Sequence, residues 1–277
     1  MRMTRILYED NGTISDWSTS LNNYYTESET FSLVAAEDYI YIGMPVPFNH
    51  FFVKLSTPST AVSTITMQYY TGREFQDVVE TIDETNGFQQ DGFITFVPDK
   101  KQGWVRQDTS GTGGTITELS SVTIYDKYWA RIKFSADLDA SSVISWIGHK
   151  FSDDDQLGSE FPDLTRSTMI AAFESGKTNW EEQHVRAANI IIEDLIRQQV
   201  IHSKGQILER RSFSLASVSK VAEIIFNSFG DDYEDNKRNA QIEYEKRMNK
   251  SIFDIDLNED GRLDVSEQRL RQGFMSR

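Results

Sequence analysis

The hydrophobic pattern of the chain changes its period near residue 150, and this change restricts the fold more than any other feature. Before it, apolar residues fall in short runs rich in β-branched and aromatic residues, separated by turn signals such as Asn86–Gly87 and Asp91–Gly92. The clearest runs are Asp38–Gly43, Phe51–Ser56, Thr64–Tyr70, Phe93–Val97, Tyr128–Phe134 and Val143–Gly148. Many short strands with no helix between them predict an antiparallel sandwich or barrel, and we assign residues 1–150 to an antiparallel β-sandwich domain.

Beyond residue 161 the apolar residues recur at helical spacing. One face is formed by Val185, Ala188, Ile192, Leu195 and Ile196, and a second by Leu215, Val218, Val221, Ala222, Ile225 and Phe229. Thr178 and Glu181 have the spacing of a capping box, which predicts that Thr178 is the N-cap of the first of these helices. The intervening segment, residues 151–161, has the composition of a linker, and residues 162–277 form the expected helical domain.

A third helix is expected from Asp231 to Ile252, and its apolar stripe is thin. The stripe holds Tyr233, Ala240, Tyr244, Met248 and Ile252, while the remaining positions are densely charged. Because such a helix has little apolar surface to bury, we expect it to project into solvent or to lie on a partner. The two halves together predict an α+β multidomain fold with a C-terminal helical domain.

The composition excludes several classes of protein. The chain has 43 acidic and 28 basic residues, a formal net charge of -15, which is the wrong sign for a general binder of nucleic acid or anionic membrane. It contains no cysteine, so disulfides, thiol catalysis and thiolate metal sites are excluded. There is no run of about 18 apolar residues and no apolar stretch typical of a signal peptide near the N-terminus. We expect no membrane association.

Near the C-terminal end, the segment DLNEDGRLDVSE carries oxygen-bearing residues at the spacing of a calcium loop. The candidate ligands are Asp256, Asn258, Asp260, Arg262 through its backbone carbonyl, Asp264 directly or through a water, and Glu267 with both carboxylate oxygens. Calcium takes roughly six to eight oxygen ligands, and Gly261 stands where such a loop must turn sharply. The spacing predicts a structural Ca²⁺ site in residues 256–267. The alternative is a surface acidic turn with chance spacing.

This loop resembles the EF-hand and related calcium loops such as those of dockerins. Both families pair two loops, whereas this sequence has a single one, so we expect a structural staple between the last two helices instead of a sensor. Ile252, Phe253 and Ile255 are expected to finish the incoming helix, and Leu270 and Phe274 to belong to the outgoing one.

The other motifs give no catalytic constellation. Glu174–Thr178, with the sequence ESGKT, imitates the end of a phosphate-binding loop, but Ala171 stands where that loop needs glycine; Gly176 is better explained as a helix stop. The four histidines, His50, His149, His184 and His202, are mutually isolated in sequence, and no serine lies in a G-x-S-x-G motif. Four aromatic residues, Tyr69, Tyr70, Trp104 and Trp129, could stack on sugars, but packing in a sandwich core is the favoured interpretation. We expect no enzymatic activity.

Two groups of motifs carry a resemblance that covers most of the chain. The stretches YYTGREFQDVV, QQDGFITFVP, GWV and YWARIKFS are similar to β-sandwich modules of phage tail and neck proteins. The helical half, from NWEEQHVRAANIIIEDLIRQQV to FGDDYEDNKRNAQIEYEKRMNK, resembles the head-to-tail adaptor proteins that dock beneath the portal.

This resemblance implies a structural protein of a tailed-bacteriophage virion, assembled in the host cytoplasm. Its partners would be portal and tail or neck proteins, and its own copies would form a homo-oligomeric ring, with DNA passing through at most. Two other classes stay open. One is a calcium-stabilised carbohydrate-binding or adhesion module on a viral or bacterial surface, and the other is a hydrolase whose carboxylate pair the sequence does not locate.

Overall fold

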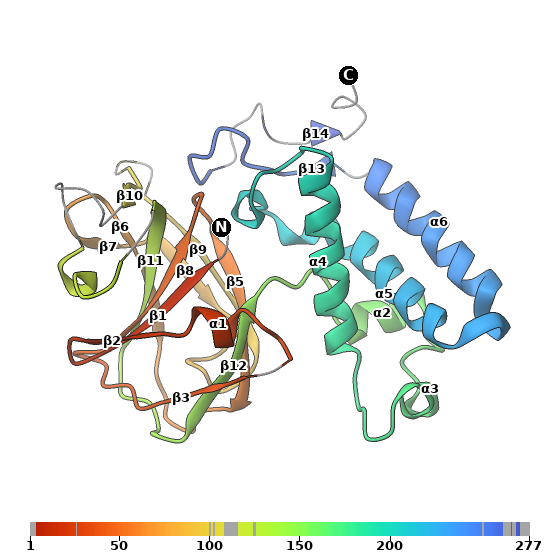
Figure 1. Cartoon of the computed structure of the whole chain (residues 1–277), viewed down its shortest axis with the longest axis horizontal. Helices are drawn as coiled ribbons and strands as arrows, with labels where there is room; N and C mark the ends of the chain where they lie inside the picture. The colour runs from red at the N-terminus through yellow and green to blue at the C-terminus, as the bar shows by residue number, and fades with distance from the viewer. Residues whose placement is uncertain are drawn as a thin grey trace. The chain divides into compact units, whose positions relative to one another are not determined.

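The computed structural model describes residues 4–25, 27–99, 101, 103–107, 116–123, 126–250, 252–262, 267, 270 and 271 (Figure 1). The chain divides into two compact units. The first, the strand unit, comprises Met1–Gly148 and Asn258–Arg262, and the second, the helical unit, comprises His149–Leu257 and Leu263–Arg277. The expected α+β class is confirmed, because the described strands form antiparallel sheets and the longer helices lie in the C-terminal half.

Two antiparallel sheets build the strand unit. The first has the order β2-β1-β4-β11-β6-β7, with β10 pairing β11; its strands are β1 (Arg5–Asp10), β2 (Thr13–Asp16), β4 (Tyr39–Met44), β6 (Ile65–Tyr70), β7 (Phe75–Asp77), β10 (Arg106–Gln107) and β11 (Lys127–Phe134). The second has the order β3-β12-β5-β9-β8; its strands are β3 (Glu29–Phe31), β5 (His50–Thr57), β8 (Glu80–Asp83), β9 (Gly92–Val97) and β12 (Ser142–Gly148). The unit also contains helix α1 (Ser18–Leu21), between β2 and β3, and the 3-10 turn η1 (Thr117–Leu119), between β10 and β11.

Both sheets contribute side chains to one hydrophobic core. In β11, Ile132 is paired with Ile40 of β4 on one side and Met67 of β6 on the other, and these three side chains are fully buried. Phe51 of β5 and Ile94 of β9 belong to the same buried cluster from the second sheet. Ala130, Ile132 and Phe134 recur at every second position of β11, and this face of the strand lies in the core, as expected for a strand.

The opposite face of the first sheet is also covered. Tyr41 and Trp129 point away from the shared core, and both are fully buried in a second cluster with Ile116 and Leu119. The segment around η1 thus shields the outer face of β4 and β11 from water. A sheet buried on both faces accounts for the high aromatic content of this half.

The helical unit contains α2 (Asp154–Glu160), α3 (Ser167–Phe173), α4 (Glu181–Arg197), α5 (Ser214–Ser228) and α6 (Glu234–Lys250). Short 3-10 turns lie between them: η2 (Lys204–Gln206), η3 (Arg210–Phe213) and η4 (Gly230–Tyr233). The expected linker at residues 151–161 is wrong, because this segment belongs to the unit's core. Asp153 caps α2 by accepting a hydrogen bond from the Gln156 backbone, and Leu157 is fully buried.

The start of α4 also differs from the expectation. Thr178 does not cap it; the helix begins at Glu181, and the N-cap position is held by Trp180. The Trp180 backbone N–H donates to the carboxylate of Asp154 instead, at 3.2–3.3 Å. The Asp154 carboxylate therefore accepts the helix-start hydrogen bond that the Thr178 hydroxyl was predicted to accept. Local spacing could not reveal this partner, because it lies 26 residues away in the sequence.

Helix α6 does not project into solvent. It lies alongside α5 (Figure 1), and its stripe residues Ala240, Tyr244 and Met248 are 1%, 6% and 5% exposed. The spacing of four residues keeps all three on one face, so a thin stripe suffices to close the helical core. The charged remainder forms ion pairs along the helix, such as Lys246 with Glu243 at 2.8 Å.

The elements that flank the predicted calcium loop are strands, not helices. The short strand β13 (Ile252–Phe253) follows α6 and pairs antiparallel with β14 (Leu270–Arg271). The expectation of an incoming and an outgoing helix is therefore wrong for these residues, and Phe274 lies outside the described part of the chain. Pairing of β13 with β14 brings the two ends of the loop together by backbone hydrogen bonds, a role that paired helices play in an EF-hand.

Candidate functional site

The first and last predicted ligands of the calcium loop are buried carboxylates of the helical unit. Asp256 is 0% exposed and Glu267 is 5% exposed. The backbone N–H of Leu257 donates to Oε1 of Glu267 at 2.9 Å, so the Glu267 carboxylate lies beside the start of the loop. Burial of two acidic side chains costs free energy unless hydrogen bonds or a cation compensate for it.

The loop start is anchored to η2 by an exchange of hydrogen bonds that the sequence did not suggest. The backbone N–H of Asp256 donates to the backbone carbonyl of Gln206 at 2.9 Å. The side-chain Nε2 of Gln206 donates to the backbone carbonyl of Asp256 at 2.8 Å. Oε1 of Gln206 accepts from the backbone N–H groups of His202 and Ser203. A single buried amide therefore fixes the backbone of the first loop position.

The middle of the loop, Asn258–Arg262, belongs to the strand unit. Oδ1 of Asn258 accepts from the Asp260 N–H at 3.0 Å, and Oδ1 of Asp260 accepts from the Arg262 N–H at 2.9 Å. Gly261 has φ +82°, as its predicted position in a sharp turn requires, and a Cβ there would lie 2.8 Å from Cβ of Pro47. The Arg262 guanidinium donates to the Asp99 carbonyl at 2.9 Å.

The oxygen donors of these residues are the kind that a hard cation prefers. The donors are all oxygens, and two of the carboxylates are buried at adjoining ends of the loop. Among the described residues, no group of three or more His, Asp or Glu side chains is gathered closely enough to hold a metal. Asp264, the third of the four acidic ligands in the prediction, lies outside those residues.

The four aromatic residues considered for sugar binding lie in or against the core of the strand unit. Tyr69 and Trp129 are fully buried, and Tyr70 is 3% exposed. Trp104 is half-buried, packs 5.2 Å from the Phe48 ring and donates its indole N–H to the Trp129 carbonyl at 3.1 Å. The favoured interpretation, core packing, is confirmed for these side chains, and they offer no stacking platform.

The Glu174–Thr178 segment is a helix-to-helix turn, as its missing glycine suggested. Helix α3 ends at Phe173, and Gly176 has φ +87°. The Lys177 ammonium lies 3.3 Å from Glu182 and 3.9 Å from Glu174, so it is engaged in ion pairs. This arrangement does not resemble a phosphate-binding loop, where the lysine faces the ligand.

One constellation was missed by the sequence, because its members lie far apart in the chain. Nε2 of His184 on α4 lies 3.1 Å from Oδ1 of Asp154 on α2, and Nδ1 lies 2.7 Å from Oγ of Ser152. Oγ of Ser217 on α5 is 2.7 Å from the Ser152 oxygen. His184, Ser152 and Ser217 are 1%, 4% and 0% exposed, so the group is inside the helical unit.

The donors and acceptors of this network limit where its protons can lie. With a neutral imidazole, Nε2 of His184 would carry the proton that faces Asp154, because a carboxylate only accepts. Ser152 would then donate to Nδ1, and Ser217 would donate to Ser152. Burial alone would raise the pKa of Asp154, but the hydrogen bonds from His184 and the Trp180 backbone outweigh it, and the pKa is lowered.

The network contains the residue types of a serine hydrolase without an accessible nucleophile. In such enzymes the serine oxygen must reach a bound carbonyl carbon. Here both serine oxygens are hydrogen-bonded within the core, and Ser152 binds Nδ1, the nitrogen that in chymotrypsin-type triads binds the carboxylate. The arrangement joins α2, α4 and α5, and it acts as a structural link.

No protein-family model matches the sequence, and no curated protein matches it either. Among the described residues, no helix is long and apolar enough to cross a membrane.

Proposed function

We propose that this protein is a structural component of a phage virion, a head-to-tail adaptor or neck subunit that forms a ring between portal and tail. The observation that carries the proposal is the order of its parts, an antiparallel-sheet unit followed in sequence by a helical unit. That order is the one implied by the resemblance of the two halves to neck β-modules and to helical adaptors. The proposed location is the virion, after assembly in the host cytoplasm.

A role without catalysis is supported by the fate of the polar residues. In the Ser152–His184–Asp154 group, whose composition comes nearest to an active site among those described, Ser152 and His184 are buried and the Asp154 side chain is 34% exposed. The aromatic side chains that favoured a carbohydrate-binding module are used for core packing.

A ring requires two different complementary patches on each subunit. The outer face of α6 is the candidate for one of them. Ile242 lies on this face, opposite the buried stripe, and is 50% exposed amid charged neighbours. A single exposed isoleucine is ordinary on a protein surface, so Ile242 serves as the position at which the proposed contact is tested.

We further propose that residues 256–267 hold a calcium ion that stabilises the fold. Asp256, Asn258, Asp260, Asp264 and Glu267 would supply side-chain oxygens, and Arg262 its carbonyl. The ion would supply positive charge that compensates for the buried carboxylates of Asp256 and Glu267. The Gln206 hydrogen bonds would hold the first position in place for it.

The ring proposal is tested by electron microscopy of the purified protein in negative stain, alone and mixed with the portal protein encoded by a neighbouring gene. Rings in either sample are expected. The variant Ile242→Asp should lose them while its unfolding curve stays unchanged. A protein that remains monomeric in both samples, and that also fails to bind tail proteins, would contradict the assignment. Monomer alone would not, because adaptor-type contacts commonly order only on docking.

A further inference from the structure

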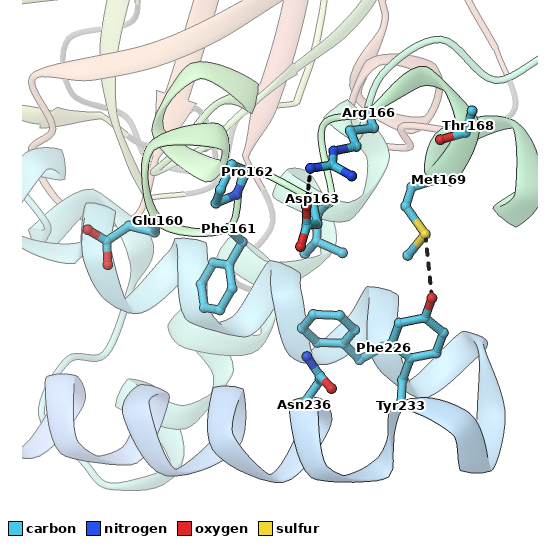
Figure 2. A pocket seen from close by; sticks show the side chains of 11 residues that line it. Glu160, Phe161, Pro162, Asp163, Arg166, Thr168, Met169, Phe226, Tyr233 and Asn236 are labelled. Atoms are coloured by element: carbon cyan, nitrogen blue, oxygen red, sulfur yellow. Dashed lines mark hydrogen bonds and ion pairs between the residues drawn. The ribbon is translucent and has the colours of Figure 1, made fainter.

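The helical unit contains a pocket of about 490 Å³ (Figure 2), apart from the calcium loop and the His184 network. It lies where the turn between α2 and α3 faces α5 and the start of α6. Its floor is apolar, with Phe161, Leu164 and Met169 on one side and Phe226 and Tyr233 on the other. The volume falls within the range of roughly 300–1,000 Å³ that small-molecule sites occupy.

Three aromatic rings that line the pocket pack on one another. The rings of Phe226 and Tyr233 are stacked, with centroids 5.7 Å apart and an interplanar angle of 16°. The Phe161 ring meets Phe226 edge-on at 6.4 Å and 73°. Rings held by mutual packing form a rigid floor, and aromatic ligands gain more than area burial from such contacts.

The rim of the pocket is electrically balanced. Asp163 pairs with Arg166 at 2.7 Å, and Glu160 pairs with Arg247. Each acidic group at the mouth is therefore matched by a guanidinium within the protein. A charged ligand would meet no surplus of the opposite sign and would lose hydration on entry, so the rim favours a neutral ligand.

Two polar groups at the pocket have unused hydrogen-bonding capacity. The Tyr233 hydroxyl contacts the thioether sulfur of Met169 at 3.9 Å, its one hydrogen-bond contact in the described part of the chain, and sulfur is a weak acceptor. The Asn236 side chain is exposed at the mouth and makes no hydrogen bond within that part. Figure 2 shows both groups on the α6 side of the pocket.

We propose that this pocket binds a neutral ligand with an aromatic ring that carries one hydrogen-bonding substituent. The rings of the floor pack on the ligand, the matched rim rejects charge, and Tyr233 and Asn236 bond the substituent. The site stands independently of the assembly role. Its ligand could be presented by a polypeptide or could be a free small molecule, and the two sources share this chemistry.

The probe is p-cresol, and the readout is the methyl NMR signal of Met169, with the signal of Met67 in the strand-unit core as an internal reference. Titration should shift the Met169 signal selectively, with a Kd on the order of 1 mM for so small a ligand. 4-Methylcyclohexanol keeps the hydroxyl but lacks the aromatic ring, and 4-methylbenzoate keeps the ring but is charged. Each should bind at least about threefold more weakly than p-cresol, the factor expected for the loss of one modest interaction.

Matched variants test the location. Asn236→Trp places a ring at the mouth and should abolish the shift, whereas Arg238→Trp adds the same ring on the opposite face of α6 and should leave it intact. Tyr233→Phe keeps the stacked floor and should weaken binding about three- to tenfold, the worth of one hydrogen bond.

The source of the ligand is distinguished with N-acetyltyrosinamide, which adds peptide groups to the same ring. Tighter binding than p-cresol assigns a polypeptide side chain, and weaker binding assigns a free small molecule. The proposal is overturned if about 10 mM p-cresol leaves Met169 unshifted, a concentration well above the expected Kd. It is also overturned if the shift survives Asn236→Trp, or if either control ligand binds as tightly.

Discussion

Nε2 of His184 lies 3.1 Å from Oδ1 of Asp154, and this contact joins two helices that are separated by a turn, a third helix and a second turn in the sequence. Through its other nitrogen, His184 also contacts Ser152, which in turn contacts Ser217 of α5. One imidazole therefore links three helices of the helical unit. Because every polar atom of the ring has a partner, its burial is compensated.

The first prediction concerns this link. His184→Ala removes both hydrogen bonds and leaves a cavity, so we expect a loss of unfolding free energy on the order of 2–4 kcal/mol. Asn236→Ala removes an exposed side chain of α6 and should change stability by less than about 0.5 kcal/mol. Urea unfolding at pH 7 measures both values. Equal effects of the two substitutions would show that the link adds no stability.

A second prediction concerns pH. The pKa of Asp154 is lowered in the folded protein, so its contribution to stability is full above the unfolded value of about 3.9 and is lost as the pH falls through the folded value. Asp154→Asn removes this dependence. The stability difference between the two proteins should thus be constant above about pH 5 and should shrink below about pH 4. A difference that grows on acidification would mean that the folded-state shift has the opposite sign.

The third prediction is that calcium raises the melting temperature. Binding to the folded state alone stabilises it by mass action, and a single loop is expected to have modest affinity. Glu267→Gln keeps the shape of the ligand and removes its charge, so the increment should disappear. Glu259→Gln makes the same change at loop position 4, which supplies no ligand, and should keep the increment. Identical melting curves of the unaltered protein in calcium and in chelator would rule the site out.

The fourth prediction tests the packing of α6. Tyr244 is 6% exposed and donates its hydroxyl to Asp194 of α4 at 2.7 Å, so Tyr244→Ala should cost on the order of 3–5 kcal/mol. Ile242→Ala, on the outer face of the same helix, should cost less than about 0.5 kcal/mol. Denaturant unfolding of both variants gives the comparison. A small effect at Tyr244 would support the sequence-based expectation that α6 packs on a partner instead of on its own unit.

Strand positions and turns could be predicted because their signals are local. Asn86–Gly87 was recognised as a turn, and Gly87 has φ +69°, with a Cβ there 2.1 Å from the Ser63 carbonyl. The burial of α6 was not predicted, since a stripe of few residues does not reveal how closely α5 approaches. Thr178 was taken as a cap because spacing shows only nearby partners, whereas Asp154 is brought there by the fold.

The calcium loop likewise has features that the sequence reveals locally and features that depend on distant residues. The six proposed calcium ligands lie within twelve residues, so their spacing is visible in the sequence, and the positive φ of Gly261 agrees with its assigned turn position. The contacts that hold the loop, from Gln206 and from β14, join residues distant in sequence and left no local signal. The His184 network and the aromatic pocket were missed for the same reason, since each gathers residues from several helices.

The last prediction concerns DNA, which an adaptor must let pass without gripping. Tight duplex binding needs clusters of Lys and Arg that neutralise several phosphates, and it falls steeply with salt. This chain has 43 acidic and 28 basic residues. Of its basic residues, Arg247 and Lys177 already contact carboxylates of the protein.

We therefore expect no duplex binding tighter than micromolar at physiological salt, as measured by filter binding. Sub-micromolar affinity would contradict this expectation. If the protein lines a channel, its inner wall should be neutral or acidic, because like charge repels the phosphates and lets the duplex slide. The simpler alternative is that negative charge keeps a concentrated virion component soluble. Both alternatives forbid tight binding, but only the first requires acidic side chains along the lumen. A structure of the assembled ring distinguishes them by the charge of its channel wall.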